Sequence, residues 1–224
     1  MPDSDEISAE LGRAPETIGG VPAWWLRDAP EASHRRALSL GLTEDRRLHQ
    51  MRRPLPAPAA PADVVLRPFR PGLDDAEWLT VNNAAFAGHP DQGSWTLDDL
   101  RGRLSESWFE AGGFLVHENG DGHIDGSCWT RYHPDSDPAS GEIYVIGTAP
   151  GAQGHGLGRA LVLGGLAWQW EHHRPPVGTL YVEHDNSAAI GLYRRLGFEI
   201  HHDDVSYVLA GAGSAGGATV TGLR

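Results

Sequence analysis

The stretch GEIYVIGTAPGAQGHGLGRA, residues 141–160, contains a strand pattern, a glycine-rich loop and the start of an apolar helix pattern. The strand is predicted by the alternation of two sets of residues, Ile143, Val145 and Gly147 against Glu142, Tyr144, Ile146 and Thr148. Pro150 ends this pattern, and an apolar run over residues 159–170 follows the glycines. Such a loop presents backbone N–H groups at the positive end of a helix dipole. It therefore predicts a site for phosphate or pyrophosphate.

Three kinds of phosphate loop have glycines at comparable spacing. A P-loop needs Lys followed by Ser or Thr after its second glycine, and the chain contains no lysine. A Rossmann loop needs G-x-G-x-x-G, but Arg159 stands where the third glycine belongs. The third pattern is Q-x-x-G-x-G from Gln153 to Gly158, and it resembles the acetyl-CoA loop of the GNAT family of N-acetyltransferases. A plain glycine-rich turn between strand and helix is the alternative.

Length and composition indicate one ordinary globular domain with additional material, since the chain has 224 residues of which 40% are hydrophobic. No apolar run reaches the roughly 18 residues of a membrane span. The start, MPDSDEISAE, is acidic where a signal peptide is basic and then apolar. We therefore expect a cytoplasmic protein without a membrane partner. The single cysteine, Cys128, excludes an internal disulfide and is expected to be a small buried residue in a strand.

The charge of the chain argues against nucleic acid as a partner, because duplex affinity depends on basic residues and the net charge is −12. A small anionic cofactor needs only local donors and stays possible. Twelve histidines raise the question of a metal. The adjacent pairs at 172–173 and 201–202 point in different directions on a helix or strand, and no H-x-x-x-H or cysteine accompanies them. We expect no metal.

The chain divides at a proline-rich linker, PLPAPAAPA, over residues 54–62. Before it, residues 1–30 have few apolar positions in any period and predict a loosely packed or mobile start, with a helix over 31–40 and a strand over 46–53 following. After it, residues 63–210 form a complete pattern. The tail, residues 211–224, is of low complexity and is expected to be disordered.

The pattern after the linker predicts an α/β domain with a mixed central sheet flanked by helices, antiparallel in its first half. Its order is β-α-α-β-β-β-α-β-α-β. The predicted strands cover 64–69, 114–117, 124–132, 142–148, 179–183 and 198–209, and the predicted helices cover 74–87, 96–106, 158–171 and 187–196.

A second motif, VEHDNSAAIGLYRRLGF at residues 182–198, strengthens the resemblance to the GNAT family. It resembles the later motif of that family, in which an Asn follows a strand, small residues open the next helix and a Tyr lies late in it. Two spaced motifs in the right order are more specific than either alone. The resemblance implies the GNAT, or acyl-CoA N-acyltransferase, fold and acetyl-CoA as co-substrate.

The resemblance extends to the mycothiol synthases, a group of tandem GNAT enzymes that acetylate the cysteinyl amine of cysteinyl-glucosaminyl-inositol. The segments NNAAFAGHPDQGSWT, ESWF and CWTRYHPDS, together with both motifs, look like the C-terminal half of these enzymes over residues 64–209. Residues 34–56 resemble the end of their first domain. We therefore expect residues 1–53 to be a remnant of a first GNAT-like domain that is mostly missing and partly disordered. The sequence leaves open whether this shortening is natural or reflects a misplaced start.

Two residues are candidates for the chemistry of amide formation. An α-amino group has a pKa of about 7.7 to 8.0, so a modest base suffices, and Glu142 at the start of the central strand matches the base of the family. Tyr193 lies about two turns into the last helix, and a phenol can protonate a departing thiolate. The alternatives are a solvated strand-end carboxylate for Glu142 and a core tyrosine for Tyr193.

The binding residues follow from the resemblance. The backbone of Ile146, Gly147 and Thr148 is expected to pair with the pantetheine amides, as an added strand would. The pyrophosphate is expected on the loop residues Gln153, Gly154, His155, Gly156, Leu157, Gly158 and Arg159, and the rest of the pantetheine on Asn186, Ser187, Ala188, Ala189, Ile190 and Gly191. The acceptor pocket is expected to involve Glu110, Arg131, Glu142 and Tyr181. Arg131 stands where the family has lysine, so specificity is open to change.

The sequence leaves two other functions open. One is a GNAT enzyme that acetylates another small-molecule or peptide amine, which the missing first domain favours. The other is a non-catalytic remnant that binds acyl-CoA, and the presence of both Glu142 and Tyr193 argues against it. In each case we expect a monomer or a weak homodimer.

Overall fold

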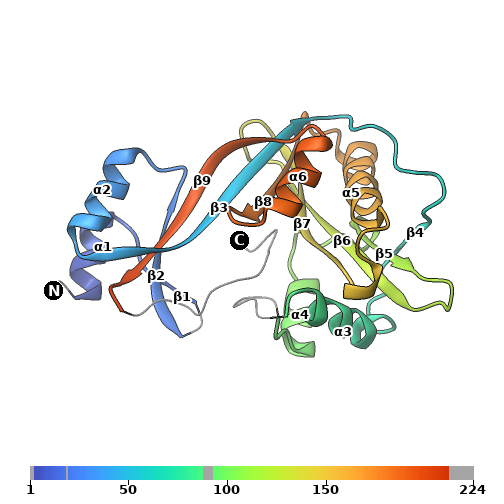
Figure 1. The fold of residues 1–224 in the computed structure, drawn as a ribbon, viewed down its shortest axis with the longest axis horizontal. Coiled ribbons are helices and arrows are strands. Elements are labelled where there is room, and N and C mark those ends of the chain that lie inside the picture. Colours follow the sequence, from blue (N-terminus) through green and yellow to red (C-terminus); the bar gives the residue numbers. More distant parts are fainter. Residues whose placement is uncertain (1–2, 19, 88–92, 212–224) are drawn as a thin grey trace.

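The computed structural model describes residues 3–18, 20–87 and 93–211. Within these residues, nine strands form one sheet in the order β1-β2-β9-β3-β8-β7-β6-β5-β4 (Figure 1). Residues before the linker form α1 (Ser4–Leu11), β1 (Glu16–Ile18), β2 (Val21–Arg27), α2 (Glu31–Ser39) and β3 (Leu42–Pro54). Residues after it form β4 (Leu66–Pro68), α3 (Asp75–Ala85), α4 (Leu97–Leu104), η1 (Ala111–Gly113), β5 (Phe114–Glu118), β6 (Ile124–His133), β7 (Ser140–Thr148), η2 (Pro150–Ala152), α5 (Leu157–His173), β8 (Val177–Glu183), α6 (Ser187–Arg195) and β9 (Glu199–Leu209).

The order from β4 to β9 is the predicted one, and the sheet is mixed as expected. Strands β4 to β7 are antiparallel neighbours, β7 and β8 run parallel, and β3 lies antiparallel between β8 and β9. The parallel pair follows from the connection through α5, since parallel neighbours need a crossover of this length. The fold class predicted from the sequence is therefore confirmed.

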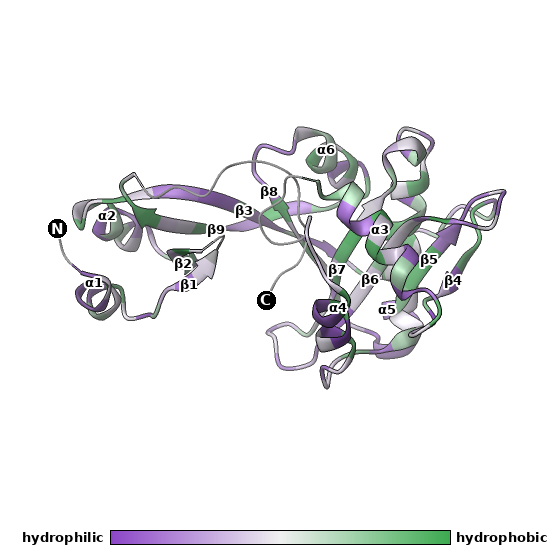
Figure 2. Ribbon diagram, turned by 90° about the horizontal axis from the view of Figure 1, so that it is seen from below, coloured by the Kyte–Doolittle hydropathy of each residue, from purple (hydrophilic) through white to green (hydrophobic). Residues whose placement is uncertain are grey.

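The molecule has two lobes that share the long strands β3 and β9 (Figure 1). We call α1, α2, β1, β2 and the adjoining ends of β3 and β9 the N-terminal lobe. The remaining elements, with the other ends of β3 and β9, are the main lobe. Hydrophobic residues are concentrated on strands inside the main lobe, whereas much of β3 and α4 is hydrophilic (Figure 2).

The main lobe has a hydrophobic core on each face of its sheet. The first core lies under α5 and α6 and includes Ile143, Leu161 and Leu180. The second lies under α3 and α4 and contains a group of packed aromatic rings, among them Trp78 and Trp129. Cys128 belongs to the first core, where burial raises the pKa of its thiol, so its predicted role as a small buried residue is confirmed.

The prediction of a loosely packed start is wrong for the described residues before Pro30. These residues form α1, β1 and β2, and α1 begins with a capping box in which Asp3 and Glu6 each accept a backbone N–H. Trp24 is fully buried and donates from Nε1 to Ser8 Oγ at 3.1 Å. The segment has few apolar residues of its own, but Leu42 of β3 and Val205 and Tyr207 of β9 complete its core.

The linker lies within the described residues, whereas the tail lies mostly outside them. Residues 55–61 form neither helix nor strand, and Leu55, Ala57 and Ala60 pack on the first core. The predicted disordered tail lies, from residue 212 onward, outside the described residues. Among the described helices none is both long and apolar enough to cross a membrane.

Candidate active site

The parallel strands β7 and β8 part halfway along their length. Their ladder pairs residues 140–143 of β7 with residues 177–180 of β8, and within the described chain no further pairs join them. Beyond this point β7 stays paired with β6, where Ile146 faces Cys128 and Gly147 faces Ser127. The opposite edge of β7, at Ile146, Gly147 and Thr148, therefore offers backbone donors and acceptors to a ligand that can pair as a strand does.

A β-bulge lies where the strands part. The register between β6 and β7 shifts between Trp129 and Thr130, so that Tyr144 is an extra residue in β7. As a result both Tyr144 and Val145 contribute to the second core, while Ile143 and Ile146 face the first. The regular alternation predicted for residues 142–148 is wrong at this point. A bulge bends its strand and increases its local twist, which fits the separation from β8.

The glycine loop is shaped by its backbone conformation. Gly154 and Gly156 have φ of 82° and 86°, in the left-handed region that side chains rarely adopt. A Cβ at either position would meet no atom within 4 Å, so conformation, not space, requires glycine there. Gly156 caps α5, and no side chain among the described residues accepts from the first turn of this helix. These N–H groups are therefore available to an anion.

Glu142 is a buried carboxylate on the face of the second core. Its neighbour Ile143 belongs to the first core, and adjacent strand residues point to opposite faces. His133 Nε2 lies 2.6 Å from Glu142 Oε2, and the exposed fractions of the two side chains are 30% and 3%. Glu142 Oε1 is also buried but has no hydrogen-bond partner among the described residues. A buried carboxylate oxygen without a hydrogen-bond partner destabilises the folded protein by about 1–3 kcal/mol, and a donor on a bound ligand would offset this cost.

Arg131 and Tyr144 lie beside Glu142. Arg131 is the cross-strand partner of Glu142, and its guanidinium carbon lies 4.6 Å from the centre of the Trp108 ring. The side chain of Tyr144 is fully buried, and burial raises the pKa of this phenol to about 12. Tyr144 is therefore neutral at physiological pH, and it adds a polar but uncharged group to the site.

Tyr193 lies on the other face of the sheet. It is 3% exposed, belongs to the first core with Ile190 and Leu180, and its ring centre lies 6.0 Å from that of Phe198. The ring thus points toward the sheet, as predicted from the helical spacing. Glu142 and Tyr193 face opposite sides of the sheet, and the parting of β7 from β8 is the place where a ligand could meet both.

The structure brings together three of the four predicted acceptor residues. Arg131, Glu142 and Tyr181 lie on the same face, because Glu142 pairs with Arg131 on one side and with Thr179, two residues before Tyr181, on the other. The Tyr181 hydroxyl accepts a hydrogen bond from Gln50 Nε2. Glu110 is placed elsewhere, since its Oε1 lies 2.9 Å from His173 Nε2 at the end of α5.

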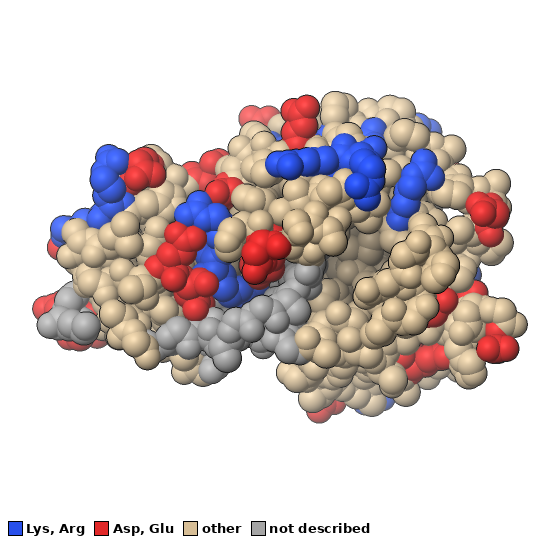
Figure 3. Space-filling model, in the orientation of Figure 1, with Lys and Arg blue, Asp and Glu red and all other residues tan. Residues whose placement is uncertain are grey.

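The predicted pantetheine segment opens α6. Asn186 caps this helix, its side-chain oxygen accepting from the N–H of Ala189 at 3.1 Å. Ser187 and Ala188 are exposed, Ala189 and Gly191 are half-buried, and Ile190 is buried in the first core. Basic side chains gather over α6 in Figure 3, and its last turn carries Arg194 and Arg195, whose charge complements the helix dipole.

Metal-binding potential is limited to one group among the described residues. Ligand atoms of Glu183, His184 and Asp185 lie within 4.8 Å of one another. Glu183 already pairs with Arg46 Nη2 at 2.6 Å, and exposed acidic groups often lie this close without an ion. The expectation that the protein needs no metal stays a prediction.

His133 and Gln50 are site residues that the sequence analysis missed. His133 ends β6 and pairs with Ser140, so the short connection between β6 and β7 places it diagonally across from Glu142. This spacing could have predicted the contact. Gln50 could not have been found, because β3 precedes the linker and its pairing with β8 joins residues 131 positions apart.

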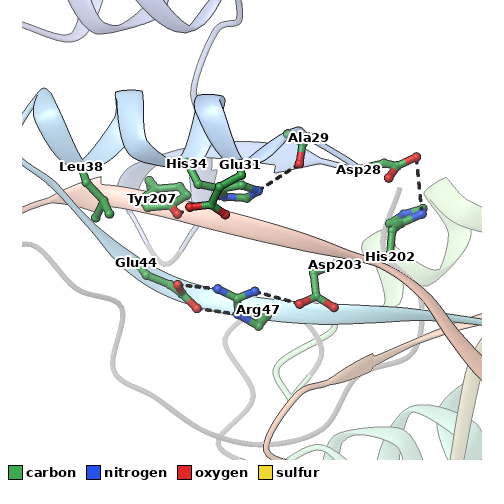
Figure 4. A pocket seen from close by; sticks show the side chains of 10 residues that line it. All are labelled: Asp28, Ala29, Glu31, His34, Leu38, Glu44, Arg47, His202, Asp203 and Tyr207. Atoms are coloured by element: carbon green, nitrogen blue, oxygen red, sulfur yellow. Dashed lines mark hydrogen bonds and ion pairs between the residues drawn. The ribbon is translucent and has the colours of Figure 1, made fainter.

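A pocket of about 410 Å³ lies in the N-terminal lobe (Figure 4). It is lined by Asp28, Ala29, Glu31, His34, Leu38, Glu44, Arg47, His202, Asp203 and Tyr207. None of these residues was predicted to bind substrate or cofactor. Arg47 donates to Glu44 and Asp203, each at 2.8 Å, and its hydrogen bonds to Glu44 foremost raise the pKa of the guanidinium. We therefore place the candidate active site at the parting of β7 and β8.

The parting of β7 and β8 and the uncapped start of α5 agree with the fold and cofactor loop that the resemblance to the GNAT N-acetyltransferases implies. The family model described as "Acetyltransferase (GNAT) family" matches residues 78–198, and the chain belongs to this family. GNAT acetyltransferases use acetyl-CoA. A solved GCN5-related N-acetyltransferase from Sphaerobacter thermophilus superposes with a TM-score of 0.67 over 91% of this chain and 64% of that one. At 23% identity this supports the fold alone.

The most informative sequence relatives are mycothiol acetyltransferases. The chain is 45% identical over 209 residues to that of Salinispora arenicola (strain CNS-205), covering 90% of this chain and 67% of the relative. It is 50% identical over 175 residues to that of Acidimicrobium ferrooxidans, covering 75% of this chain and 56% of the relative. The chain thus spans between 56% and 67% of the length of these two relatives.

Proposed function

We propose that this enzyme transfers an acetyl group from acetyl-CoA directly to the cysteinyl amine of cysteinyl-glucosaminyl-inositol, the reaction of the mycothiol acetyltransferases it resembles. The observation that carries the proposal is the buried Glu142 carboxylate at the parting of β7 and β8, whose Oε1 has no partner among the described residues. A substrate ammonium group supplies the donor that this oxygen needs.

Two features of the chain fit acetyl-CoA. The first turn of α5 and the loop from Gln153 to Arg159 offer backbone N–H groups to the pyrophosphate. The open edge of β7 at Ile146, Gly147 and Thr148 offers hydrogen bonds to the pantetheine amides. Residues 186–191 of the α6 start would contact its far end. The bound co-substrate supplies an activated acetyl thioester.

The reaction needs two proton transfers, and the residues proposed for them lie on opposite faces of the sheet. Glu142 takes a proton from the acceptor's ammonium group, whose pKa of about 7.7 to 8.0 leaves it mostly charged near pH 7. The neutral amine can then attack. Tyr193, buried on the other face, donates its phenolic proton to the departing thiolate and recovers it from solvent.

The acceptor would lie on the face that carries Arg131, Glu142 and Tyr181. Polar and charged groups suit an acceptor rich in hydroxyls. Glu110 pairs with His173, so a role in this pocket would require it to exchange that partner for the substrate.

A second candidate is acetylation of another small-molecule or peptide amine. It is favoured by Arg131, which stands in place of the lysine of the mycothiol synthases, since guanidinium and ammonium bind hydroxyls with different geometry.

Acetyl transfer assayed as CoA release with a panel of amines distinguishes these functions. The panel contains cysteinyl-glucosaminyl-inositol, glucosaminyl-inositol without the cysteine, amino sugars and short peptides. We expect the first compound to give the highest kcat/KM by at least about 100-fold, corresponding to about 2.7 kcal/mol. A higher value for another amine would support the second candidate. Acetyl-CoA binding without transfer to any of them would show a non-catalytic protein.

A further inference from the structure

The one hydrogen bond described for the Glu142 side chain comes from His133, which lies outside the predicted site. His133 Nε2 is 2.6 Å from Glu142 Oε2, on the neighbouring strand β6. A carboxylate can only accept hydrogen bonds, so Nε2 must carry the proton and donate it. The contact therefore occupies one oxygen of the candidate base and leaves Oε1 for the substrate.

The backbone of His133 is held by its surroundings. It ends β6, paired with Ser140 at the first residue of β7. In the turn between the strands, Ser136 Oγ donates to the carbonyl of His133 at 3.0 Å and lies 3.1 Å from Ser140 Oγ. A glutamate side chain has several rotatable bonds, and a hydrogen bond to one of its oxygens removes part of that freedom.

We propose that His133 is a positioning residue that orients Glu142 so that Oε1 faces the amine to be acetylated, an inference that rests on the proposed function. The imidazole acts through Glu142 and does not touch the reacting atoms. The imidazole aligns the carboxylate. Its N–H occupies Oε2, so the substrate ammonium pairs with Oε1, the oxygen from which proton transfer is productive.

A double-mutant cycle tests this role. In the wild-type background, His133→Ala should lower kcat by about 10- to 100-fold, as loss of an orienting partner does elsewhere, with KM for acetyl-CoA within about twofold. His133→Gln should keep most of the wild-type kcat, because the amide of the introduced glutamine can donate from nearly the same place as the imidazole Nε2. In the Glu142→Gln background, His133→Ala should have almost no further effect, since the group it orients is gone.

His123 provides the matched control. It also pairs with a glutamate, its Nδ1 lying 3.0 Å from Glu77 Oε1, but it lies at the opposite end of β6. His123→Ala should leave kcat unchanged in both backgrounds. A loss of rate with His133→Ala that is equally large in the Glu142→Gln background would overturn the positioning role, and so would an unchanged kcat.

The contact itself has a readout that needs no substrate. In ¹⁵N spectra of histidine-labelled protein, the Nε2 signal of His133 should move on Glu142→Gln, while the signals of His123 stay in place. Unchanged His133 signals would overturn the proposal independently of activity. If the wild type acetylates none of the amines, the proposed function fails and the positioning role with it. An active wild type with an additive cycle removes the positioning role alone.

Discussion

The two lobes share strands β3 and β9, but polar groups in the two lobes differ in whether they have hydrogen-bond partners within the protein. In the N-terminal lobe, α1 is closed by a capping box and the indole of Trp24 donates to Ser8. In the main lobe, α5 has no side-chain cap, β7 parts from β8, and Glu142 Oε1 has no described partner. A buried polar group left without a partner is destabilising unless a ligand supplies one. The groups at the parting of β7 and β8 are thus open to a ligand, whereas the start of α1 and the Trp24 indole are satisfied within the protein.

The largest effect is expected for Glu142→Gln, which tests the functional half of this comparison. General base catalysis contributes about 10²- to 10⁴-fold, so kcat should fall by that factor. The loss should be greatest at low pH, where the amine is charged, and should shrink above about pH 8, where the free amine predominates. Steady-state rates between pH 6 and pH 9.5 measure this. An equal loss at every pH would argue against Glu142 as the base.

Trp24→Ala tests the structural half. The side chain is fully buried in the N-terminal lobe, so its removal should cost about 3–5 kcal/mol of unfolding free energy. Because β3 and β9 belong to both lobes, we expect a single unfolding transition at lower denaturant concentration, with kcat for the remaining folded enzyme near that of the wild type. Two separate transitions would show that the lobes unfold independently.

Asp74→Asn examines how the main lobe is stabilised at its outer edge. Asp74 is 3% exposed and accepts from Arg67 and Arg70. Burial alone would raise the pKa of Asp74, but the hydrogen bonds from Arg70 and Arg67 outweigh it and lower the pKa from 3.8 to about 2. The stabilisation of about 2 kcal/mol is therefore present above about pH 4 and is lost as the pH falls toward 2.

The expected result for Asp74→Asn is thus a loss of about 2 kcal/mol at pH 7 that becomes smaller toward pH 2. Urea unfolding of both proteins at several pH values measures the difference. A difference that does not depend on pH would mean that the charge of Asp74 contributes little.

Gly156→Val should have the smallest effect and separates the loop from the base. The left-handed conformation of this residue strains a β-branched side chain, so the loop should shift and KM for acetyl-CoA should rise by about 10-fold, or 1.4 kcal/mol. The kcat of this variant should change little. Gly151→Val, at a neighbouring glycine with an ordinary φ and open space, is the control. An unchanged KM in Gly156→Val would count against the loop as the cofactor site.

The sequence predicted the main lobe well because its signals are local. The alternation around Ile143, the glycines of the loop and the helical spacing of Tyr193 each concern residues close together in the chain. The bulge at Tyr144 could not be predicted, since it depends on the register with β6. The packed structure of the N-terminal segment could not be predicted, because Trp24 is buried against residues of β9 about 180 positions away.

The same distinction applies to the candidate site. Glu142 and the loop follow from short motifs, whereas the contacts of Tyr181 with Gln50 and of Glu110 with His173 depend on how distant elements pack. The roles of all these residues stay predictions until they are measured.

The strands shared by the two lobes also have a mechanical consequence. From Leu48 to Arg52, β3 is paired with β8 on one side and with β9 on the other. Because β3 and β9 belong to both lobes, a force that draws the lobes apart along the strands would load the hydrogen bonds between β3 and β8 together in shear. Gln50 adds a side-chain hydrogen bond to Tyr181 at this ladder, so the same force would reach a residue of the candidate acceptor pocket.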